Sequence, residues 1–386
     1  MADYDVVVVG IGGMGSATLY QLARRGLKVL GIEQFGQVAH NMGSSHGLTR
    51  IIRLAYYEDP SYVPLLRRAY ELWTQIEQET DEQIYYQTGS LDIGTEDSEV
   101  FAGSLRSCQQ HNLEHEVLTS AQITERFPGY RFPAAYRAVY QPQGGIIVPE
   151  RAIEAHVQAA QAYGAELHTG ERVQGWEPTP NGGVTIRTEA ATYTARRLVL
   201  CGGAWNYKLL PQLEGVAVPE RQVLIWLETK QPEWFTPGAF PVWNAKTEEG
   251  RYYGFPEFNP SGETPGMKYG RWHHLDEQVD PDEVDRETHP ADETLLRQFG
   301  ERYFPDGAGR TLDMQVCMFT NTADEHFVID TLPDTPQVSV AAGFSGHGYK
   351  LCSAVGEVMA DLAQHGETAH NIELFSLQHH GVEAIS

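Results

Sequence analysis

The sequence predicts an α/β fold with two parts, of which the second is an α+β unit built on an antiparallel sheet. Three stretches lead to this prediction. Residues 4–33 have the pattern of a strand, a glycine-rich turn, a helix and a second strand. Aromatic, proline-punctuated strands fill residues 222–314, and residues 338–364 again have the pattern of strand, glycine turn and helix. We therefore expect the two ends of the chain to build one part together.

The opening stretch has the features of a dinucleotide-binding site. A β-branched apolar run, Tyr4–Val9, leads into the sequence GIGGMG at 10–15, and an amphipathic helix follows. Gly10 allows the tight turn, Gly12 lets a pyrophosphate approach the backbone, and Gly15 lets the helix pack on the sheet. Roughly 20 residues further on, the second strand ends at Glu33, whose carboxylate can bind ribose hydroxyls. The pattern predicts a Rossmann-like domain, and the acidic residue favours FAD or NAD over NADP.

The composition fits an ordinary soluble protein and argues against several classes of partner. A chain of 386 residues is long enough for two domains. Its net charge of −24 repels phosphate backbones and anionic lipid, so we expect neither nucleic-acid nor membrane binding. No leader precedes the first strand and no apolar run is long enough for a membrane span. The cysteines, at 108, 201, 317 and 352, have neither disulfide nor metal-site spacing. We expect a cytoplasmic protein with reduced thiols and no metal.

The remaining elements follow from periodicity and turn residues. Residues 43–53 form a polar, glycine-bounded loop that runs into a short strand with two arginines. Helices are predicted over residues 64–78, 101–111, 120–127 (with Ser120 as N-cap), 150–163 and 292–304, and strands over 84–93, 166–169, 184–188, 193–201, 222–228 and 250–258. The predicted first domain comprises residues 1–83, 145–215 and 320–386, and the second comprises 84–144 and 216–319.

Four motifs are more specific than any periodicity. They are GIGGMG at 10–15, GSSHGLTRIIR at 43–53, CMFTNTADEHFVID at 317–330 and GFSGHGYK at 343–350. Together they closely resemble the monomeric sarcosine oxidase and N-methyltryptophan oxidase family of flavoenzymes, over essentially the whole chain. The resemblance implies FAD in the Rossmann-like domain, tethered through a thioether from Cys317, with the antiparallel sheet as a roof over the flavin. It also implies oxidation of a secondary amino acid to an imine that hydrolyses, with dioxygen reduced to hydrogen peroxide by a monomeric enzyme.

The resemblance assigns a substrate-binding set. Arg53 and Lys350 would hold the substrate carboxylate, while Asn244, Phe319 and Gly346 would lie beside the substrate. A planar guanidinium fork and an ammonium point charge together suit a carboxylate.

It also assigns a catalytic set and a cofactor-binding set. Lys268 would activate oxygen, because a cation there stabilises the negative charge that develops on oxygen as it is reduced. His46 and Arg50 would lie against the flavin, and Tyr253 and His273 would line the amine pocket. The FAD-binding set comprises Gly10, Ile11, Gly12, Gly13, Met14, Gly15, Glu33, Gln34, Gly43, Ser44, Ser45, Thr49, Val173, Trp205, Cys317, Met318, Phe344, Gly346, Gly348, Tyr349 and Lys350.

Departures from the family pattern leave the substrate open. Phe319 stands where sarcosine oxidases have tyrosine, and Asn244 stands where methionine is expected. The stretch at 272–274 is one residue longer, so Trp272, His273 and His274 compete for one pocket position. The resemblance implies a sarcosine-like substrate. Polar residues at 244, 246 and 271 add the alternative of a second carboxylate on the substrate, as in iminodiacetate, and N-methyltryptophan is a further alternative. In the iminodiacetate alternative, the second carboxylate would hydrogen-bond to these polar side chains, which lower stability if they are buried without a partner.

Two other functions share the same opening turn. An NAD-dependent dehydrogenase would be colourless as purified, whereas a flavoprotein would be yellow. A non-catalytic FAD-binding assembly partner would hold a flavin that no amino acid reduces.

Overall fold

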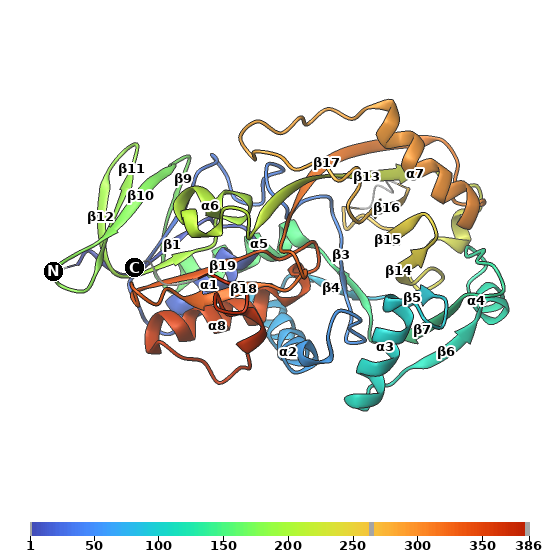
Figure 1. Ribbon diagram of the computed structural model, residues 1–386, viewed down its shortest axis with the longest axis horizontal. Helices are drawn as coiled ribbons and strands as arrows, with labels where there is room; N and C mark the ends of the chain where they lie inside the picture. Colours follow the sequence, from blue (N-terminus) through green and yellow to red (C-terminus); the bar gives the residue numbers. More distant parts are fainter. Residues whose placement is uncertain (1, 262–265, 383–386) are drawn as a thin grey trace.

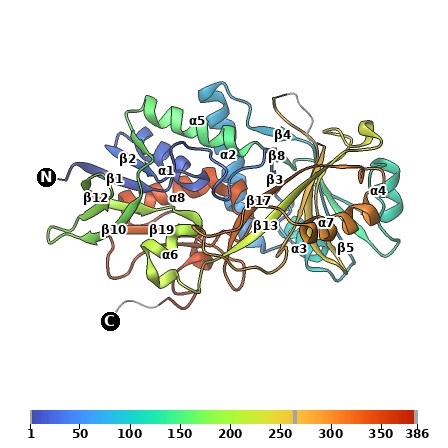
Figure 2. The same ribbon diagram turned by 90° about the horizontal axis from the view of Figure 1, so that it is seen from above.

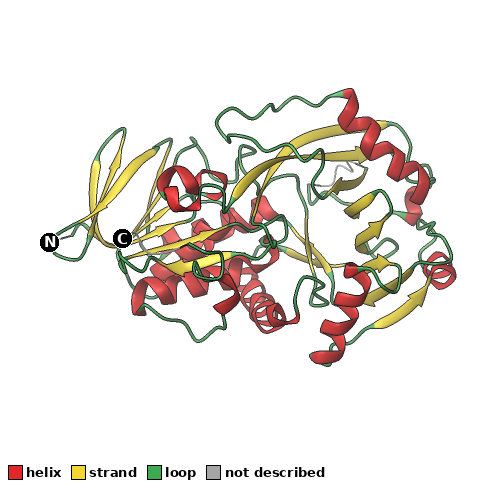
Figure 3. Ribbon diagram, viewed as in Figure 1, coloured by secondary structure: helices red, strands yellow, loops and turns green. Residues whose placement is uncertain are grey.

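The computed structural model describes residues 2–261 and 266–382. The molecule is elongated and has two parts, with both termini at the end of the first part (Figure 1, Figure 2). Helices gather around the sheet of the first part, while the second part is dominated by strands (Figure 3). Among the helices of the described residues, none combines the length and apolar character needed to cross a lipid bilayer.

The first part is a largely parallel sheet that both ends of the chain build. Its strand order is β10-β11-β12-β1-β2-β9, with β19 beside β12 and β18 beside β19. The pairs that β1 forms with β12 and β2 are parallel, as are β2–β9 and β12–β19. The bounds are β1 (Tyr4–Val9), β2 (Val29–Glu33), β9 (Glu166–Thr169), β10 (Val173–Pro178), β11 (Val184–Thr188), β12 (Thr192–Leu200), β18 (Val328–Thr331) and β19 (Val338–Ala342).

Helices α1 (Gly13–Arg24) and α8 (Cys352–His365) pack against this sheet, and α2 (Val63–Thr80) and α5 (Pro149–Ala162) pack against these two helices. The short α6 (Asn206–Leu209) contacts β10. Helices α1 and α8 touch, because a Cβ at Gly356 in α8 would lie 2.6 Å from the Ala17 carbonyl carbon in α1. Their apolar faces share one core with β1, which includes Leu19 and Val355.

A small sheet connects the two parts. It has the order β3-β8-β4, formed by β3 (Arg50–Ile52), β8 (Gly145–Ile147) and β4 (Tyr85–Gln87). The strand predicted over residues 84–93 is in fact two strands, which is a correction. The chain turns at Gly89, whose φ is +76°, and so leaves the small sheet and enters the second part at β5 (Ser90–Gly94).

The second part is a mixed sheet with the order β17-β13-β16-β15-β14-β5-β7-β6. Its ladders are antiparallel as predicted, except that β5 and β14 pair in parallel. The further bounds are β6 (Glu116–Thr119), β7 (Arg137–Gln141), β13 (Val218–Leu227), β14 (Val242–Thr247), β15 (Gly250–Glu257), β16 (Met267–Arg271) and β17 (Thr311–Asn321). The long strands β13 and β17 extend from this sheet toward the first part (Figure 1).

One face of this sheet is covered by an aromatic core. Helix α7 (Pro290–Tyr303) packs there, and its Phe299 stacks on Tyr252 with ring centroids 3.7 Å apart. Because side chains alternate along a strand, the neighbours of Tyr252 on β15 point to the opposite face, toward the first part. That opposite face is called the site face below.

The remaining elements are short. Helices α3 (Glu99–Gln110) and α4 (Ser120–Arg126) flank β5 to β7, and 3-10 turns occupy Pro60–Tyr62, Gly203–Trp205, Pro211–Leu213, Pro232–Trp234, Tyr349–Leu351 and Glu373–Phe375. The N-cap of α4 is Thr119 rather than Ser120. Thr119 forms a capping box with Gln122, whereas the Ser120 hydroxyl donates to the carbonyl of Phe132.

Candidate functional site

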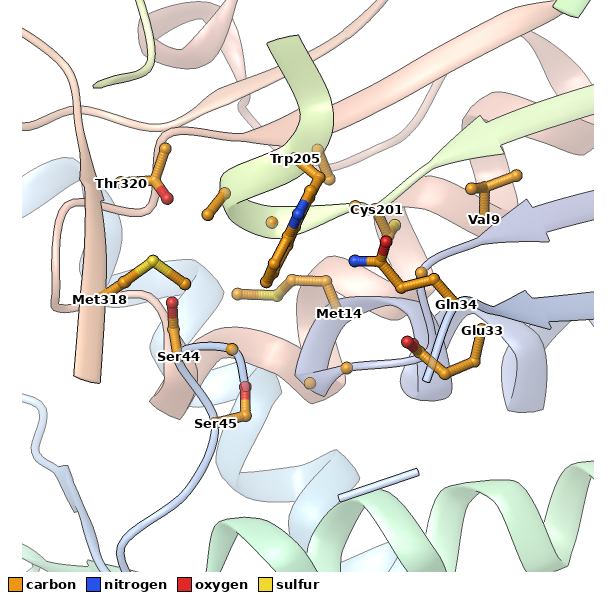
Figure 4. A pocket seen from close by; sticks show the side chains of 18 of the residues that line it. Val9, Met14, Glu33, Gln34, Ser44, Ser45, Cys201, Trp205, Met318 and Thr320 are labelled. Atoms are coloured by element: carbon orange, nitrogen blue, oxygen red, sulfur yellow. The ribbon is translucent and has the colours of Figure 1, made fainter. Parts of the chain in front are cut away.

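A cavity of about 590 Å³ lies between the opening glycine turn and the second part. Figure 4 shows Glu33 and Gln34 at one end, Met318 and Thr320 at the other, and Met14 and Trp205 between them. From the predicted sets, the cavity is lined by Gly10, Gly12, Gly13, Met14, Glu33, Gln34, Gly43, Ser44, Ser45, Arg50, Val173, Trp205, Met318, Phe319, Phe344, Gly346, Gly348 and Tyr349. Of the predicted cofactor set, Ile11, Gly15, Thr49, Cys317 and Lys350 are not part of its wall.

The glycine turn has the space that a pyrophosphate needs. Gly10 has a φ of +86°, and a Cβ there would lie 2.6 Å from the Cys201 carbonyl oxygen. A Cβ at Gly15 would lie 1.8 Å from the Gly10 oxygen, so this glycine allows the helix to approach the turn. Above Gly12 the space is open, since the nearest described heavy atom, Ser45 Oγ, would be 4.0 Å from a Cβ. Within the described residues no side chain caps α1, so its first N–H groups can bind an anion.

Glu33 ends β2 at the edge of the cavity and is 4% exposed. Its carboxylate accepts hydrogen bonds from the backbone N–H groups of Ile11 at 2.9 Å and Phe35 at 3.1 Å. These bonds fix the carboxylate where it can also accept from ribose hydroxyls.

Lys268 lies on the site face, between Phe255 and Trp226 of the neighbouring strands. It is buried, and its Nζ donates to the Gly47 carbonyl at 2.5 Å and to the Thr49 carbonyl and hydroxyl at 3.1 and 3.0 Å. Burial holds the pKa of Lys268 well below its usual value, and nearby Arg50 lowers it further.

His46 lies in the same buried region. Neither ring nitrogen has a hydrogen-bond partner among residues 2–261 and 266–382. Burial lowers its pKa to about 3, assisted by Arg50 and Lys268, so the ring is neutral. An uncharged imidazole with both nitrogens free is available to a bound ligand.

Cys317 lies on β17, 2% exposed, with its Sγ 3.9 Å from the Ser44 carbonyl oxygen. Burial raises the pKa of the thiol, while Arg50 and Lys268 lower it. Its neighbours Met318 and Ser44 line the cavity.

Arg53 and Lys350 meet at one aromatic ring. The guanidinium carbon of Arg53 lies 4.6 Å from the Tyr56 ring centroid and the Lys350 Nζ lies 5.2 Å from it. Both side chains are buried, and burial together with Arg53 lowers the pKa of Lys350 to about 7. Arg53 is already engaged, because its Nη2 donates to both oxygens of Glu58 at 3.0 and 2.8 Å. Its Nε lies 3.7 Å from Asp92.

The polar residues that suggest a second carboxylate are engaged elsewhere. Asn244 is on the site face, but its amide donates to the buried Asp92 at 2.8 Å. The Lys246 ammonium lies 3.5 Å from Glu99, with a side chain 42% exposed. Arg271 donates to the carbonyls of residues 273 and 274. The structure therefore does not bring these three side chains to one ligand site.

The stretch at 272–274 places its side chains in different surroundings. Trp272 packs against Phe319, with ring centroids 5.4 Å apart. His273 lies between the carboxylates of Glu220 at 2.8 Å and Glu325 at 3.4 Å, and these hydrogen bonds raise its pKa to about 9. His274 points away, toward a carboxylate at the start of α7.

Several residues around this site are not predicted from the sequence. They are Tyr56, Tyr57 and Glu58, together with Asp92, Arg251 and His347. The first three lie three to five positions after Arg53, and an acid so close to an arginine was a usable signal. His347 lies inside the GFSGHGYK motif, and its pKa is lowered by burial to about 4. Asp92 and Arg251 have no local signal.

The structure also groups possible metal ligands that the sequence keeps apart. Glu220, His273 and Asp276 offer ligand atoms within 4.8 Å of one another, as do three residues at 324, 379 and 380. In the first group, however, His273 and Glu220 are hydrogen-bonded to each other.

Comparison with known proteins identifies relatives of this chain. A family model described as "FAD dependent oxidoreductase" matches residues 5–362. A monomeric sarcosine oxidase of Bacillus sp. (strain NS-129) is 43% identical over 379 residues, covering 97% of this chain and 96% of the relative. An N-methyl-L-tryptophan oxidase of Yersinia pestis (strain Pestoides F) is 34% identical, covering 97% of this chain and 99% of the relative. A solved structure of NikD, described as an unusual amino acid oxidase essential for nikkomycin biosynthesis, has a TM-score of 0.82 at 26% identity and covers 97% of both chains.

These findings confirm the predicted fold class and decide between the nucleotides. The matched family uses FAD, so the NAD-dependent alternative falls away. The likeness also covers the whole catalytic part, because the sarcosine oxidase alignment spans 97% of the chain, and this argues against a non-catalytic partner. The chain therefore belongs to the FAD-dependent oxidoreductase family and, within it, to the group of monomeric sarcosine oxidases and N-methyl-L-tryptophan oxidases.

Proposed function

We propose that the protein is a flavin-dependent oxidase of secondary amino acids carrying an N-methyl or N-carboxymethyl group. The observation that supports this best is that the buried side chains of Arg53 and Lys350 both lie against the Tyr56 ring, beside a dinucleotide-sized cavity. A substrate carboxylate that takes the place of Glu58 on Arg53 would be bound by both groups. FAD, when bound, supplies the acceptor for the two electrons that leave the substrate.

The residues present fit FAD. The open backbone at Gly12 and the uncapped start of α1 suit a pyrophosphate, and Glu33 suits a ribose. His46, which lies near Arg50 and Lys268, has two ring nitrogens without a hydrogen-bond partner in the described part of the chain, as expected of a group that hydrogen-bonds a ring system.

The chain's own residues would bind and orient the substrate. A carboxylate next to Lys350 adds an opposite charge and raises the lysine pKa from about 7, so substrate binding favours the ammonium form. Arg53 must exchange Glu58 for the substrate carboxylate. Tyr253, Trp272 and Phe319 form a connected aromatic wall that would keep water from the amine.

Lys268 would act on dioxygen. Its lowered pKa reflects burial with few compensating charges, so negative charge developing beside it is strongly favourable. The three acceptors around Nζ hold the ammonium in one place before the reaction.

Cys317 would carry the flavin covalently, as the CMFT motif implies. Its position beside Ser44, which lines the cavity, supports this. We further propose a monomer that works in the cytoplasm, in keeping with the monomeric relatives.

The test is an anaerobic titration of the purified yellow protein with sarcosine, N-methyl-L-tryptophan and other N-substituted amino acids. We expect at least one to bleach the flavin absorbance, and readmitted air to restore it with one hydrogen peroxide per cycle. A flavin that none of them reduces would refute the proposal.

A further inference from the structure

Unpartnered hydrogen-bond donors gather around Arg251 on the site face. Arg251 is 9% exposed, and its Nε has no hydrogen-bond partner among the described residues. The same holds, within the described chain, for Nε1 of Trp272, which is 5% exposed, and for the hydroxyl of Tyr57, which is 4% exposed. A buried donor without a partner costs about 1–3 kcal/mol, so such a concentration indicates a place where a ligand supplies the acceptors.

Arg251 lies beside both of the other side chains. The Arg251 guanidinium carbon lies 4.0 Å from the Trp272 ring centroid and 5.8 Å from that of Tyr57. Arg251 shares its face of β15 with Tyr253, because the two are separated by one residue of the strand. The group thus belongs to the wall of the amine pocket.

Tyr57 connects this group to the carboxylate-binding arginine. Its ring centroid lies 4.4 Å from the Arg53 guanidinium carbon, so the two guanidinium carbons can be no more than about 10 Å apart. Two buried arginines therefore lie beside one aromatic ring, at a separation that a small dicarboxylate can span.

The charged side chains around Arg251 leave it able to bind an anion. One edge of its guanidinium is held by Glu325 at 2.5 Å, and Glu99, at 3.9 Å, is half exposed. Glu325 also lies 3.4 Å from His273, whose pKa of about 9 makes it a cation at neutral pH. Glu325 is thus shared between two cations, and the Nε edge of Arg251 keeps its positive character.

We propose that Arg251, Trp272 and Tyr57 form a second carboxylate subsite, so that the natural substrate is an N-substituted amino acid with two carboxylates. This rests on the proposed function, in which the first carboxylate binds Arg53 and Lys350. Asn244, Lys246 and Arg271 are engaged with other partners. The proposal therefore assigns the second carboxylate to Arg251, a different residue of the same sheet.

The experiment compares three substrates in the holoenzyme. Sarcosine has one carboxylate, iminodiacetate has a second on the nitrogen substituent, and N-methyl-L-aspartate has a second on the side chain. The variants are Arg251→Gln, Arg251→Lys and, as matched control, Lys246→Gln. Lys246 is the cross-strand neighbour of Arg251 and has the same charge, but its side chain is 42% exposed.

We expect wild type to have a higher kcat/KM on one of the diacids than on sarcosine, and the better diacid identifies where the second carboxylate is attached. Arg251→Gln should lower kcat/KM for that diacid by about ten- to a hundredfold, the size of a charged hydrogen bond, with sarcosine within about threefold. Arg251→Lys should fall between, and Lys246→Gln should match wild type. Equal losses on all three substrates, or a wild type that prefers sarcosine, would overturn the subsite.

A binding measurement tests the second carboxylate subsite separately from the proposed oxidase function. Diglycolate and methoxyacetate are the ether counterparts of iminodiacetate and sarcosine and cannot be oxidised in the same way. Even if no amino acid reduces the flavin, diglycolate should raise the melting temperature of wild type more than methoxyacetate does, and Arg251→Gln should abolish this difference. Equal stabilisation by both ligands would overturn the subsite. If Arg251→Gln does not fold, Arg251→Lys decides in the same assays.

Discussion

Replacing Glu58 with glutamine should lower the stability of the ligand-free protein and increase its affinity for carboxylates. In the structure both Glu58 oxygens accept from Arg53, and both side chains are buried. Burial alone would raise the Glu58 pKa, but Arg53 holds it below its usual value, so the pair is ionic. An incoming carboxylate that binds the same guanidinium must compete with this internal one.

The magnitude follows from the pair's surroundings. Removing one partner of a buried ion pair costs about 3–5 kcal/mol. Asp92, 3.7 Å from Arg53 Nε, remains as a partial counter-charge, which favours the lower end. For 386 residues, about 3 kcal/mol corresponds to a fall in melting temperature of about 4 °C. The same free energy is no longer spent on displacing Glu58, so the dissociation constant for a carboxylate ligand should fall by about a hundredfold.

The assay is thermal unfolding and flavin-absorbance titration with methoxyacetate in wild type, Glu58→Gln and Glu357→Gln. Glu357 is a suitable control because it pairs with Arg68 on the outer helices, at 2.8 and 2.7 Å, away from the cavity. We expect both variants to melt earlier, but only Glu58→Gln to bind the ligand more tightly. Unchanged or weaker binding in Glu58→Gln would mean that the carboxylate does not compete with Glu58.

Three further predictions concern single side chains. Cys317→Ser should fold with a near-normal melting temperature and lose its yellow colour to the supernatant on acid precipitation; a colourless wild-type pellet would contradict the tether. Lys268→Met should slow reoxidation by oxygen about 10²–10³-fold and reduction by substrate far less, measured by stopped flow; equal slowing would make the lysine structural. Asp292 binds Arg221 through both oxygens at 3.0 Å, and its pKa is about 2 although burial alone would raise it. Because the folded pKa lies below the ordinary 3.8, roughly 2.5 kcal/mol of stability is present above pH 3.8 and lost as pH falls toward 2. Asp292→Asn should therefore melt earlier near neutrality and show a flatter decline in acid; an unchanged acid profile would show that another group is responsible.

Sequence reasoning succeeds where the determinants are local. The turn from Gly10 to Gly15 and the acid at the end of the next strand lie within one supersecondary unit, so their spacing alone fixes the geometry. The strands over 166–169 and 184–188 are likewise short segments in which apolar and polar residues alternate, and they form as predicted.

Sequence reasoning fails where the surroundings of a residue are formed by strands that lie far apart in the sequence. The partner of Asn244 is Asp92, 152 positions away, on a strand that pairs in parallel within an otherwise antiparallel sheet. Burial of Arg251 likewise depends on Trp272, which directly follows the adjacent strand β16, because an isolated arginine on a strand is ordinarily exposed. Because pairing between distant strands decides which side chains face the pocket, the sequence indicated a polar pocket but not which polar residues line it.

The contact between Ala17 and Gly356 has a consequence for how the protein is made. A ribosome releases β1 and α1 first and β19 and α8 last, yet β19 pairs beside β12 and α8 packs on α1. The nascent chain therefore has an incomplete sheet until its last elements are made, a state in which exposed apolar surface favours aggregation. We expect the cofactor site to form only when these elements are in place, since residues 341–352 line the same cavity as the opening glycine turn. A premature stop before Val338 would remove that wall of the site.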